Sequence, residues 1–194
     1  AATGHDSLAR REAGHQSDQV ASLRSMELGY KGSMMLGIQA AIAIFHYRPD
    51  DIAGFTDDSN GMELELAWDS GEGLSMGGSW AWTDSDRPAT ASEHQVSVFA
   101  IAQWPWGWAG MQARVEYHYR SEFCVTPQAC IAPGPAETHS QWDLGLTANY
   151  QQWTLTCYLD NLADERSGYP LPSNSNEIQD WQILSAPREY GIEL

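Results

Sequence analysis

The sequence predicts an all-β fold in which antiparallel strands run up and down across a membrane as part of a β-barrel. Three observations predict this fold. From about residue 22 onward, segments alternate apolar and polar side chains with a period of two, as a strand with two different faces does. Short and long connections follow one another in turn. Aromatic residues gather toward both ends of the segments, as in proteins that cross a bilayer with strands.

The first part of the chain is the least regular. Residues 1–21 are polar and show no sustained periodicity, so we expect a lead-in or loop there. Residues 22–31 and 36–47 are the first two expected strands. The second of these is apolar on both faces, and its pattern alone leaves a buried helix open.

The next three segments alternate more clearly. Residues 62–68 place Glu63 and Glu65 opposite four large apolar side chains, an arrangement that no helix produces. Residues 74–82 set Leu, Met and Trp on one face against Ser, Gly and Ala on the other. Residues 96–104 continue the alternation.

The remaining segments complete a set of about nine strands. Residues 111–120 carry an entirely polar face, which on a strand requires water: Gln112, Arg114, Glu116, His118 and Arg120. The last three expected strands are 142–150, 153–159 and the terminal segment within 187–194.

The connections predict the topology. Short turns are expected at 32–35, 70–73, 105–107 and 151–152, and long loops at 48–61, 84–94, 121–140 and 162–187. Tight turns at one end and long loops at the other are typical of bacterial outer-membrane barrels. The aromatics near the two ends predict two interfacial belts. One is expected near the turns, at Trp68, Trp104, Trp106, Trp108, Tyr150 and Trp153, and the other near the loops, at Phe45, Tyr47, Trp80, Trp82, Tyr117 and Tyr119.

Composition excludes several functions. The formal net charge of −16 argues against nucleic acid as a partner. No catalytic serine elbow, zinc-protease motif or phosphate-binding loop is present, so we expect no enzyme, no catalytic residues and no cofactor. Acidic residues gather at 160–165 without the spacing of a calcium loop, so we expect solvated acid and no metal site.

Three cysteines are too few for a disulfide scaffold. Cys124 and Cys130 share a Pro-rich loop, where a local bridge is plausible in an oxidising compartment. Cys157 occupies an apolar strand position and is expected to face lipid or to pack against neighbours.

Ligand contacts are expected at the polar strand faces and in the last long loop. The candidates on strands line a hydrated lumen: Glu63, Glu65, Arg114 and Arg120. The glutamates are expected to meet neighbouring basic side chains or a plug. Tyr169 and Trp181 are the loop candidates, although the same aromatics could instead pack the loop against its neighbours.

Several segments, in order, resemble strands of TonB-dependent outer-membrane receptors. The closest resemblance is at the carboxy terminus, where an Asn-Leu-x-Asp-Glu segment is followed by a loop and a strand that opens Pro-Arg-x-Tyr-Gly. The segments that carry the resemblance are MELGYKG (26–32), IFHYRPDDI (44–52), NGMELELAW (60–68), YHYRS (117–121), WDLGLTANY (142–150), WTLTCYLDNLADE (153–165) and PREYGIEL (187–194).

The resemblance implies a bacterial outer-membrane importer of a siderophore, haem, cobalamin or oligosaccharide, built on a 22-stranded barrel with a plug. Residues 22–194 would be the carboxy-terminal portion of that barrel. The expected partners are outer-membrane lipid, the remaining strands, the plug, the TonB complex acting through the plug, and a small-molecule ligand. Two alternatives remain open: a small self-contained outer-membrane barrel with a structural or adhesive role, and a soluble β-domain that buries the same apolar faces.

Overall fold

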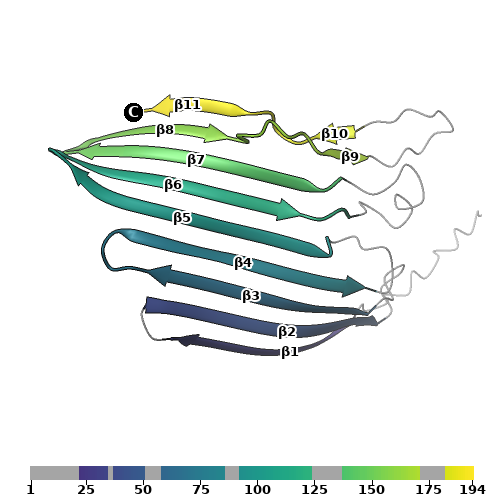
Figure 1. Ribbon diagram of the computed structural model, residues 1–194. Coiled ribbons are helices and arrows are strands. Elements are labelled where there is room, and N and C mark those ends of the chain that lie inside the picture. Colours follow the sequence, from purple (N-terminus) through teal and green to yellow (C-terminus); the bar gives the residue numbers. More distant parts are fainter. Residues whose placement is uncertain (1–21, 35–36, 51–57, 86–91, 124–136, 171–181) are drawn as a thin grey trace, which may run out of the picture.

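The computed structural model confirms an all-β, antiparallel, up-and-down fold, and it describes residues 22–34, 37–50, 58–85, 92–123, 137–170 and 182–194. Nine strands form one sheet in the order β1-β2-β3-β4-β5-β6-β7-β8-β11 (Figure 1). Their bounds are β1 (Ser22–Ser33), β2 (Ile38–Asp50), β3 (Ser59–Asp69), β4 (Leu74–Ser85), β5 (His94–Trp106), β6 (Ala109–Arg120), β7 (His139–Tyr150), β8 (Trp153–Asp160) and β11 (Glu189–Glu193). The sheet is not closed, which is consistent with part of a barrel. No helix within the described ranges has the length and apolar character to cross a membrane.

The strands are longer than the sequence pattern predicts. Most extend two or three residues past the alternating segments, because polar and turn-forming residues at their ends still pair with the neighbouring strand. The ambiguous segment 36–47 belongs to strand β2, where every residue from Ile38 to Tyr47 pairs with β3. A further hairpin was not predicted. It joins β9 (Gly168–Pro170) to β10 (Gln182–Leu184) within the last long connection.

Tight turns join β3 to β4, β5 to β6 and β7 to β8 at one end of the sheet (Figure 1). In the β3–β4 turn, polar side chains accept hydrogen bonds from the backbone of the turn itself. Asp69 accepts the N–H of Gly71 at 2.7 Å, and the Ser70 hydroxyl accepts those of Glu72 and Leu74 at 3.1 and 3.0 Å. Gly71 and Gly73 have positive φ, which glycine adopts without a Cβ penalty. The turn predicted at 105–107 begins two residues later, at Gly107, because Pro105 and Trp106 of β5 still pair with Gly110 and Ala109 of β6.

Register divides the side chains between two faces, which we name the polar face and the apolar face. Residues in successive strands that are paired in register lie on the same face, because strands side by side share one pleat. One row across the polar face is Glu65, Ser79, Ser97, His118 and Gln141. The adjacent row across the apolar face is Leu66, Gly78, Val98, Tyr117 and Trp142.

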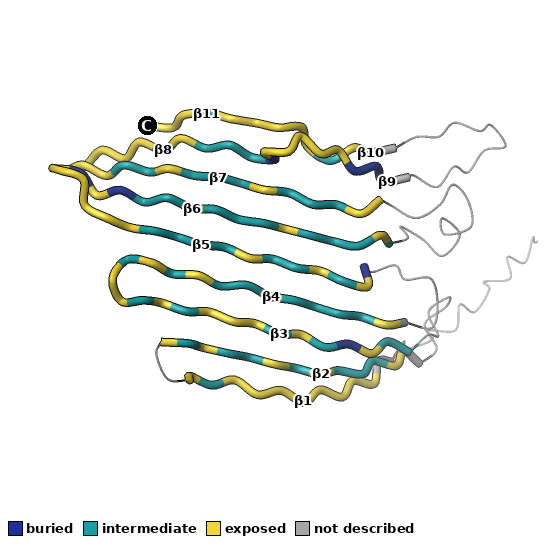
Figure 2. The backbone as a smooth tube through the Cα atoms, in the orientation of Figure 1, coloured by how far each residue is buried: buried dark blue, intermediate teal, exposed yellow. Residues whose placement is uncertain are grey.

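The apolar face is exposed and the sheet has almost no buried core. Within the described ranges, only Ala109 and Met111 are buried apolar residues. Aliphatic side chains of the apolar face are most exposed on the two edge strands, at 71% for Leu28 and 72% for Ile192, against 41% for Val98 in the middle. Figure 2 shows the same pattern, with β1 and β11 mostly exposed along their lengths. A soluble sandwich would bury one face of each sheet, and this sheet buries neither.

The predicted aromatic belts need one correction. Phe45 and Tyr47 lie on the polar face, because they pair in register with Gly61 and Ser59, one residue out of step with the apolar row. Their rings lie 4.9 Å apart. On the apolar face, Tyr117 and Trp142 are paired in register, with their rings 4.6 Å apart.

Aromatic rings of the polar face lie against glycines of adjacent strands. Phe99 of β5 lies opposite Gly77 of β4, and a methyl group built on Gly77 would come within 2.8 Å of the Phe99 ring and 3.0 Å of the Leu66 carbonyl oxygen. Tyr158 covers Gly191 of β11 in the same way. A ring that folds over a glycine shields the backbone ladder where no side chain does so.

Replacing Gly77 with alanine tests this packing. We expect Gly77→Ala to lower the free energy of unfolding by about 1–3 kcal/mol, because the ring and the carbonyl oxygen must move to admit the methyl group. Gly145→Ala is the matched control, since a methyl group there would meet only the Arg114 Cβ at 3.9 Å. Urea unfolding of the chain in detergent micelles measures both variants. Equal effects of the two substitutions would contradict the packing described.

Candidate functional site on the polar face

The polar face holds the predicted lumen residues on strands β3 and β6. Glu63 and Glu65 of β3 are exposed on this face. Glu65 lines a shallow hollow of about 480 Å³ together with Lys31, Gln39, Ser79, Ser97 and Phe99. In register, Lys31 of β1 and Glu65 of β3 flank Ala41 of β2, so the small alanine leaves open space between a cation and an anion. The hollow therefore has a cationic side chain on one side and an anionic side chain on the other.

Arg114 and Arg120 of β6 lie elsewhere on the same face. Arg114 forms an ion pair with Glu116, two residues along its own strand. The Arg120 guanidinium lies 4.6 Å from the centre of the Phe123 ring. Strands β4 and β5 separate both arginines from Glu63 and Glu65, a lateral distance of about 14 Å. The structure therefore does not bring the predicted acidic and basic candidates together as direct partners.

A group that the sequence did not predict lies between β6 and β7. Ligand atoms of Glu116, His118 and Asp143 all lie within 4.8 Å of one another. Glu116 pairs directly with Asp143, and His118 stands two residues farther on the same face of β6. The alternation of 111–120 had already placed Glu116 and His118 on one face. The contribution of Asp143 depends on the register between the strands, which the sequence does not give.

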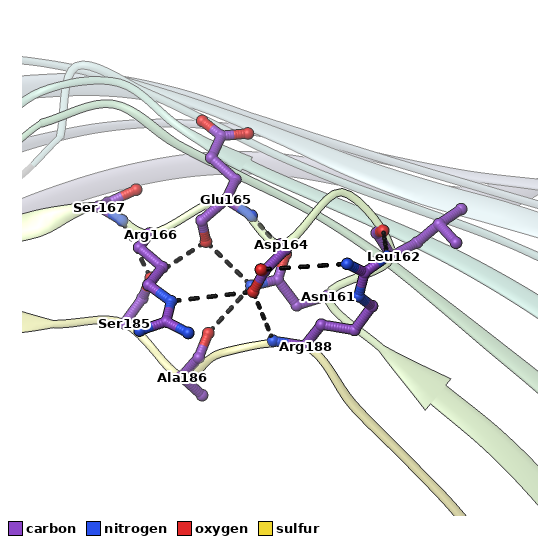
Figure 3. A network of polar contacts seen from close by, with 9 residues as sticks. All are labelled: Asn161, Leu162, Asp164, Glu165, Arg166, Ser167, Ser185, Ala186 and Arg188. Carbon is purple, nitrogen blue, oxygen red and sulfur yellow. Dashed lines mark hydrogen bonds and ion pairs between the residues drawn. The ribbon is translucent and has the colours of Figure 1, made fainter.

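Asn161 organises the connection from β8 to β11 (Figure 3). It is 1% exposed, and its side-chain amide donates to the carbonyl oxygens of Glu165 and Ala186, both at 2.9 Å. Its side-chain oxygen accepts the N–H of Glu165 at 3.0 Å. Its own N–H donates to Asp143 at 2.9 Å. With φ of 53°, Asn161 occupies the left-handed region that asparagine tolerates better than most residues.

Asp164 bonds to the start of β11 at the same junction, where the chain leaves β8 and returns as β11. Its carboxylate accepts the backbone N–H of Arg188 at 3.0 Å and lies within ion-pair distance of Arg166 and Arg188. The Arg188 N–H is the largest cause that holds the pKa of Asp164 below its usual value, and the two guanidinium groups add to it. The expectation of solvated acid at residues 160–165 is wrong for Asn161, which is buried in the junction. Asp164 is exposed to solvent and is also bonded into the junction.

The other predicted site residues are placed only in part. Tyr169 lies in β9, opposite Ile183 of β10. Trp181, Cys124 and Cys130 lie outside the described residues, so the second loop aromatic and the expected bridge stay predictions. Cys157 is a free, exposed thiol on the apolar face of β8, paired with Leu146 and Ile192. This agrees with the expected apolar strand position, and contact with lipid stays a prediction.

Comparison with known proteins identifies a related fold. No protein-family model and no curated protein sequence matches the chain. Among solved structures, the chain is similar to BauA, the ferric preacinetobactin receptor from Acinetobacter baumannii, with a TM-score of 0.66 and 13% sequence identity. The match covers 88% of this chain and 28% of the BauA chain, so this chain spans less than a third of that receptor. At this identity the similarity shows a shared fold.

Removing the Asn161 side chain tests the junction. We expect Asn161→Ala to lower the free energy of unfolding by about 3 kcal/mol, because two carbonyl oxygens and one N–H lose their partners in a buried place. Asn161→Gly removes the same bonds but relieves the left-handed backbone, so its cost is expected to be about 1 kcal/mol smaller.

Asn149 provides the control for this test. It is exposed in β7 and accepts a single side-chain bond from Thr154 at 2.9 Å, so Asn149→Ala should cost less than about 1 kcal/mol. Hydrogen exchange of the backbone amides at Glu165 and Arg188, with urea unfolding in micelles, measures all three variants. Unchanged protection in Asn161→Ala would refute the role of Asn161 at the junction.

Proposed function

We propose that residues 22–194 are the carboxy-terminal part of the barrel of a TonB-dependent outer-membrane receptor, with residues 1–21 as a lead-in or loop. In this proposal the protein is an importer, not an enzyme, and its ligand is a ferric siderophore. The observation that carries the proposal is the sheet itself: nine up-and-down strands with one exposed apolar face and one polar face.

The difference between the two faces of the sheet supports a location of the strands in a membrane. Lipid supplies no hydrogen bonds, so a membrane strand must satisfy its backbone through its neighbours, and it can expose apolar side chains at no cost. In the sheet described here, β2 to β8 are paired on both sides, and their apolar side chains remain outside any core. A lumen on the other face would be lined by Glu63, Glu65 and the polar side chains of β6 and β7.

The open edges support a longer barrel. β1 and β11 each pair with one described strand, and an unpaired edge in lipid would leave a row of N–H and C=O groups without partners. In this proposal, further strands of the same receptor pair with both edge strands. The fold similarity to a ferric siderophore receptor, and the segments that resemble TonB-dependent receptors, support the choice of this class and of the ligand.

The mechanism of the proposed receptor follows from the two ends of the sheet. The long connections leave from one end and would face the outside, where they would capture the ligand. The polar face would guide the ligand inward once a plug is moved by the TonB complex. The hollow beside Lys31 and Glu65 is on the polar face and would lie on that route.

A pair of arginine substitutions at one depth tests the orientation of the faces. Leu66 and Ala67 are neighbours in β3 and point to opposite faces. We expect Leu66→Arg to lower the free energy of unfolding in lipid vesicles by about 2–4 kcal/mol, because it places a charge in hydrocarbon. Ala67→Arg, on the polar face, is expected to cost less than about 1 kcal/mol. Equal losses would contradict a lipid-facing apolar side.

Uptake of labelled iron tests the receptor assignment. In the Gram-negative bacterium that carries the gene for this chain, deletion of the gene should reduce uptake of at least one ⁵⁵Fe-labelled siderophore at least tenfold under iron limitation. A protonophore should abolish the uptake that depends on the gene. Uptake of a labelled amino acid serves as the control for general damage. Normal iron uptake by the mutant with every siderophore class, or recovery of the protein in the soluble fraction, would overturn the proposal.

A further inference from the structure

We propose that Glu116, His118 and Asp143 bind a divalent transition-metal ion, for which Zn²⁺ is the probe. The three side chains come from β6 and β7 on the polar face, and within the described ranges they are the group whose ligand atoms lie within 4.8 Å of one another. The inference goes beyond the proposed import of a ferric siderophore, because it concerns an ion held by the sheet itself. The proposed metal site requires only that β6 pairs with β7.

The strand register explains how the three ligands meet. Glu116 and Asp143 are directly opposite each other, where Cβ atoms of neighbouring strands lie about 4.5–5.5 Å apart. His118 follows Glu116 by two residues and therefore projects from the same face. Tetrahedral coordination at about 2.1 Å separates ligand atoms by about 3.4 Å, so rotations of the side chains are sufficient to close the site.

The donor set selects the kind of ion. One imidazole nitrogen with two carboxylates matches Zn²⁺ and its neighbours in the first transition row. Ca²⁺ and Mg²⁺ prefer sites made of oxygen alone. All three residues are exposed or half-buried, so an ion can enter from the water on the polar face and keep water as a remaining ligand.

Hydrogen bonds from outside the group orient its ligands. The Ser97 hydroxyl lies 3.2 Å from His118 Nδ1, which leaves Nε2 for an ion. The side-chain amide of Gln141 donates to both oxygens of Asp143 at 2.8 and 2.9 Å, and the Asn161 N–H donates to one of them. Each carboxylate oxygen has a further lone pair for a metal. Such outer partners commonly fix the geometry of metal ligands.

Arg114 competes for the site. Its guanidinium forms an ion pair with Glu116, so an ion must draw this carboxylate partly away from a cation. Removing the arginine should therefore strengthen metal binding, whereas removing any ligand should weaken it. Loss of the arginine and loss of a carboxylate also change the surface charge in opposite directions, so the His118 substitution, which removes an imidazole and no carboxylate, distinguishes ligation from a general change in surface charge.

Calorimetric titration with Zn²⁺ of the full 194-residue chain, folded in detergent micelles, tests the proposal. We expect one saturable site whose affinity falls at least tenfold in His118→Gln and in Asp143→Asn, and rises severalfold in Arg114→Gln. His46→Gln is the matched control. His46 lies on the apolar face and is hydrogen-bonded to Asn60 at 2.8 Å, so the affinity should not change.

A spectroscopic measurement keeps the proposal falsifiable if a variant folds poorly. With Cu²⁺ as the probe, electron paramagnetic resonance of the unaltered chain should show coupling to one imidazole nitrogen, and this coupling should disappear in His118→Gln but persist in His46→Gln. No saturable Zn²⁺ binding by a chain with full β-sheet circular dichroism would overturn the proposal. Nitrogen coupling that survives in His118→Gln would overturn it as well. Loss of iron uptake is not part of this test, so failure here leaves the receptor proposal standing.

Discussion

The backbone ladder between neighbouring strands is the constraint on which the rest of this structure depends. Each strand from β2 to β8 pairs with a neighbour on both sides, and the sheet has almost no buried core within the described ranges to hold it in another way. The ladder also fixes the register. Register decides which side chains share a face, so the apolar face, the polar rows and the meeting of Glu116 with Asp143 are consequences of the same pairing.

A buried polar residue, Asn161, holds the connection from β8 to β11 in place. After Asp160 the chain leaves β8, makes the long connection and returns as β11 beside the same strand. Asn161 bonds both the outgoing chain at Glu165 and the returning chain at Ala186. Its N–H also donates to Asp143, which connects this junction to the proposed metal ligands on the polar face. A side chain with two donors and an acceptor can do this in the space of one residue.

Sequence reasoning succeeded where one face differed sharply from the other. Glu63 and Glu65 among Met, Leu and Trp fixed both the strand and its faces. The same reasoning was weak at 36–47, where both faces are apolar, and it placed Phe45 and Tyr47 in a lipid-facing belt although they lie on the polar face. An aromatic ring does not reveal its face when its neighbours are also apolar. The β9–β10 hairpin escaped prediction because three-residue strands are too short to show a period.

The sequence by itself determined the fold class, the up-and-down topology, the existence of a polar and an apolar face, and the class of protein that the chain resembles. These features are local, because a period of two and a tight turn can be recognised within a few residues. Only the tertiary structure decided which distant residues meet. Asp143 joins Glu116 and His118, and Asn161 joins Glu165 to Ala186, because of pairings between segments that are remote in the chain. A shift of one residue in the register of β7 against β6 would send Asp143 to the other face.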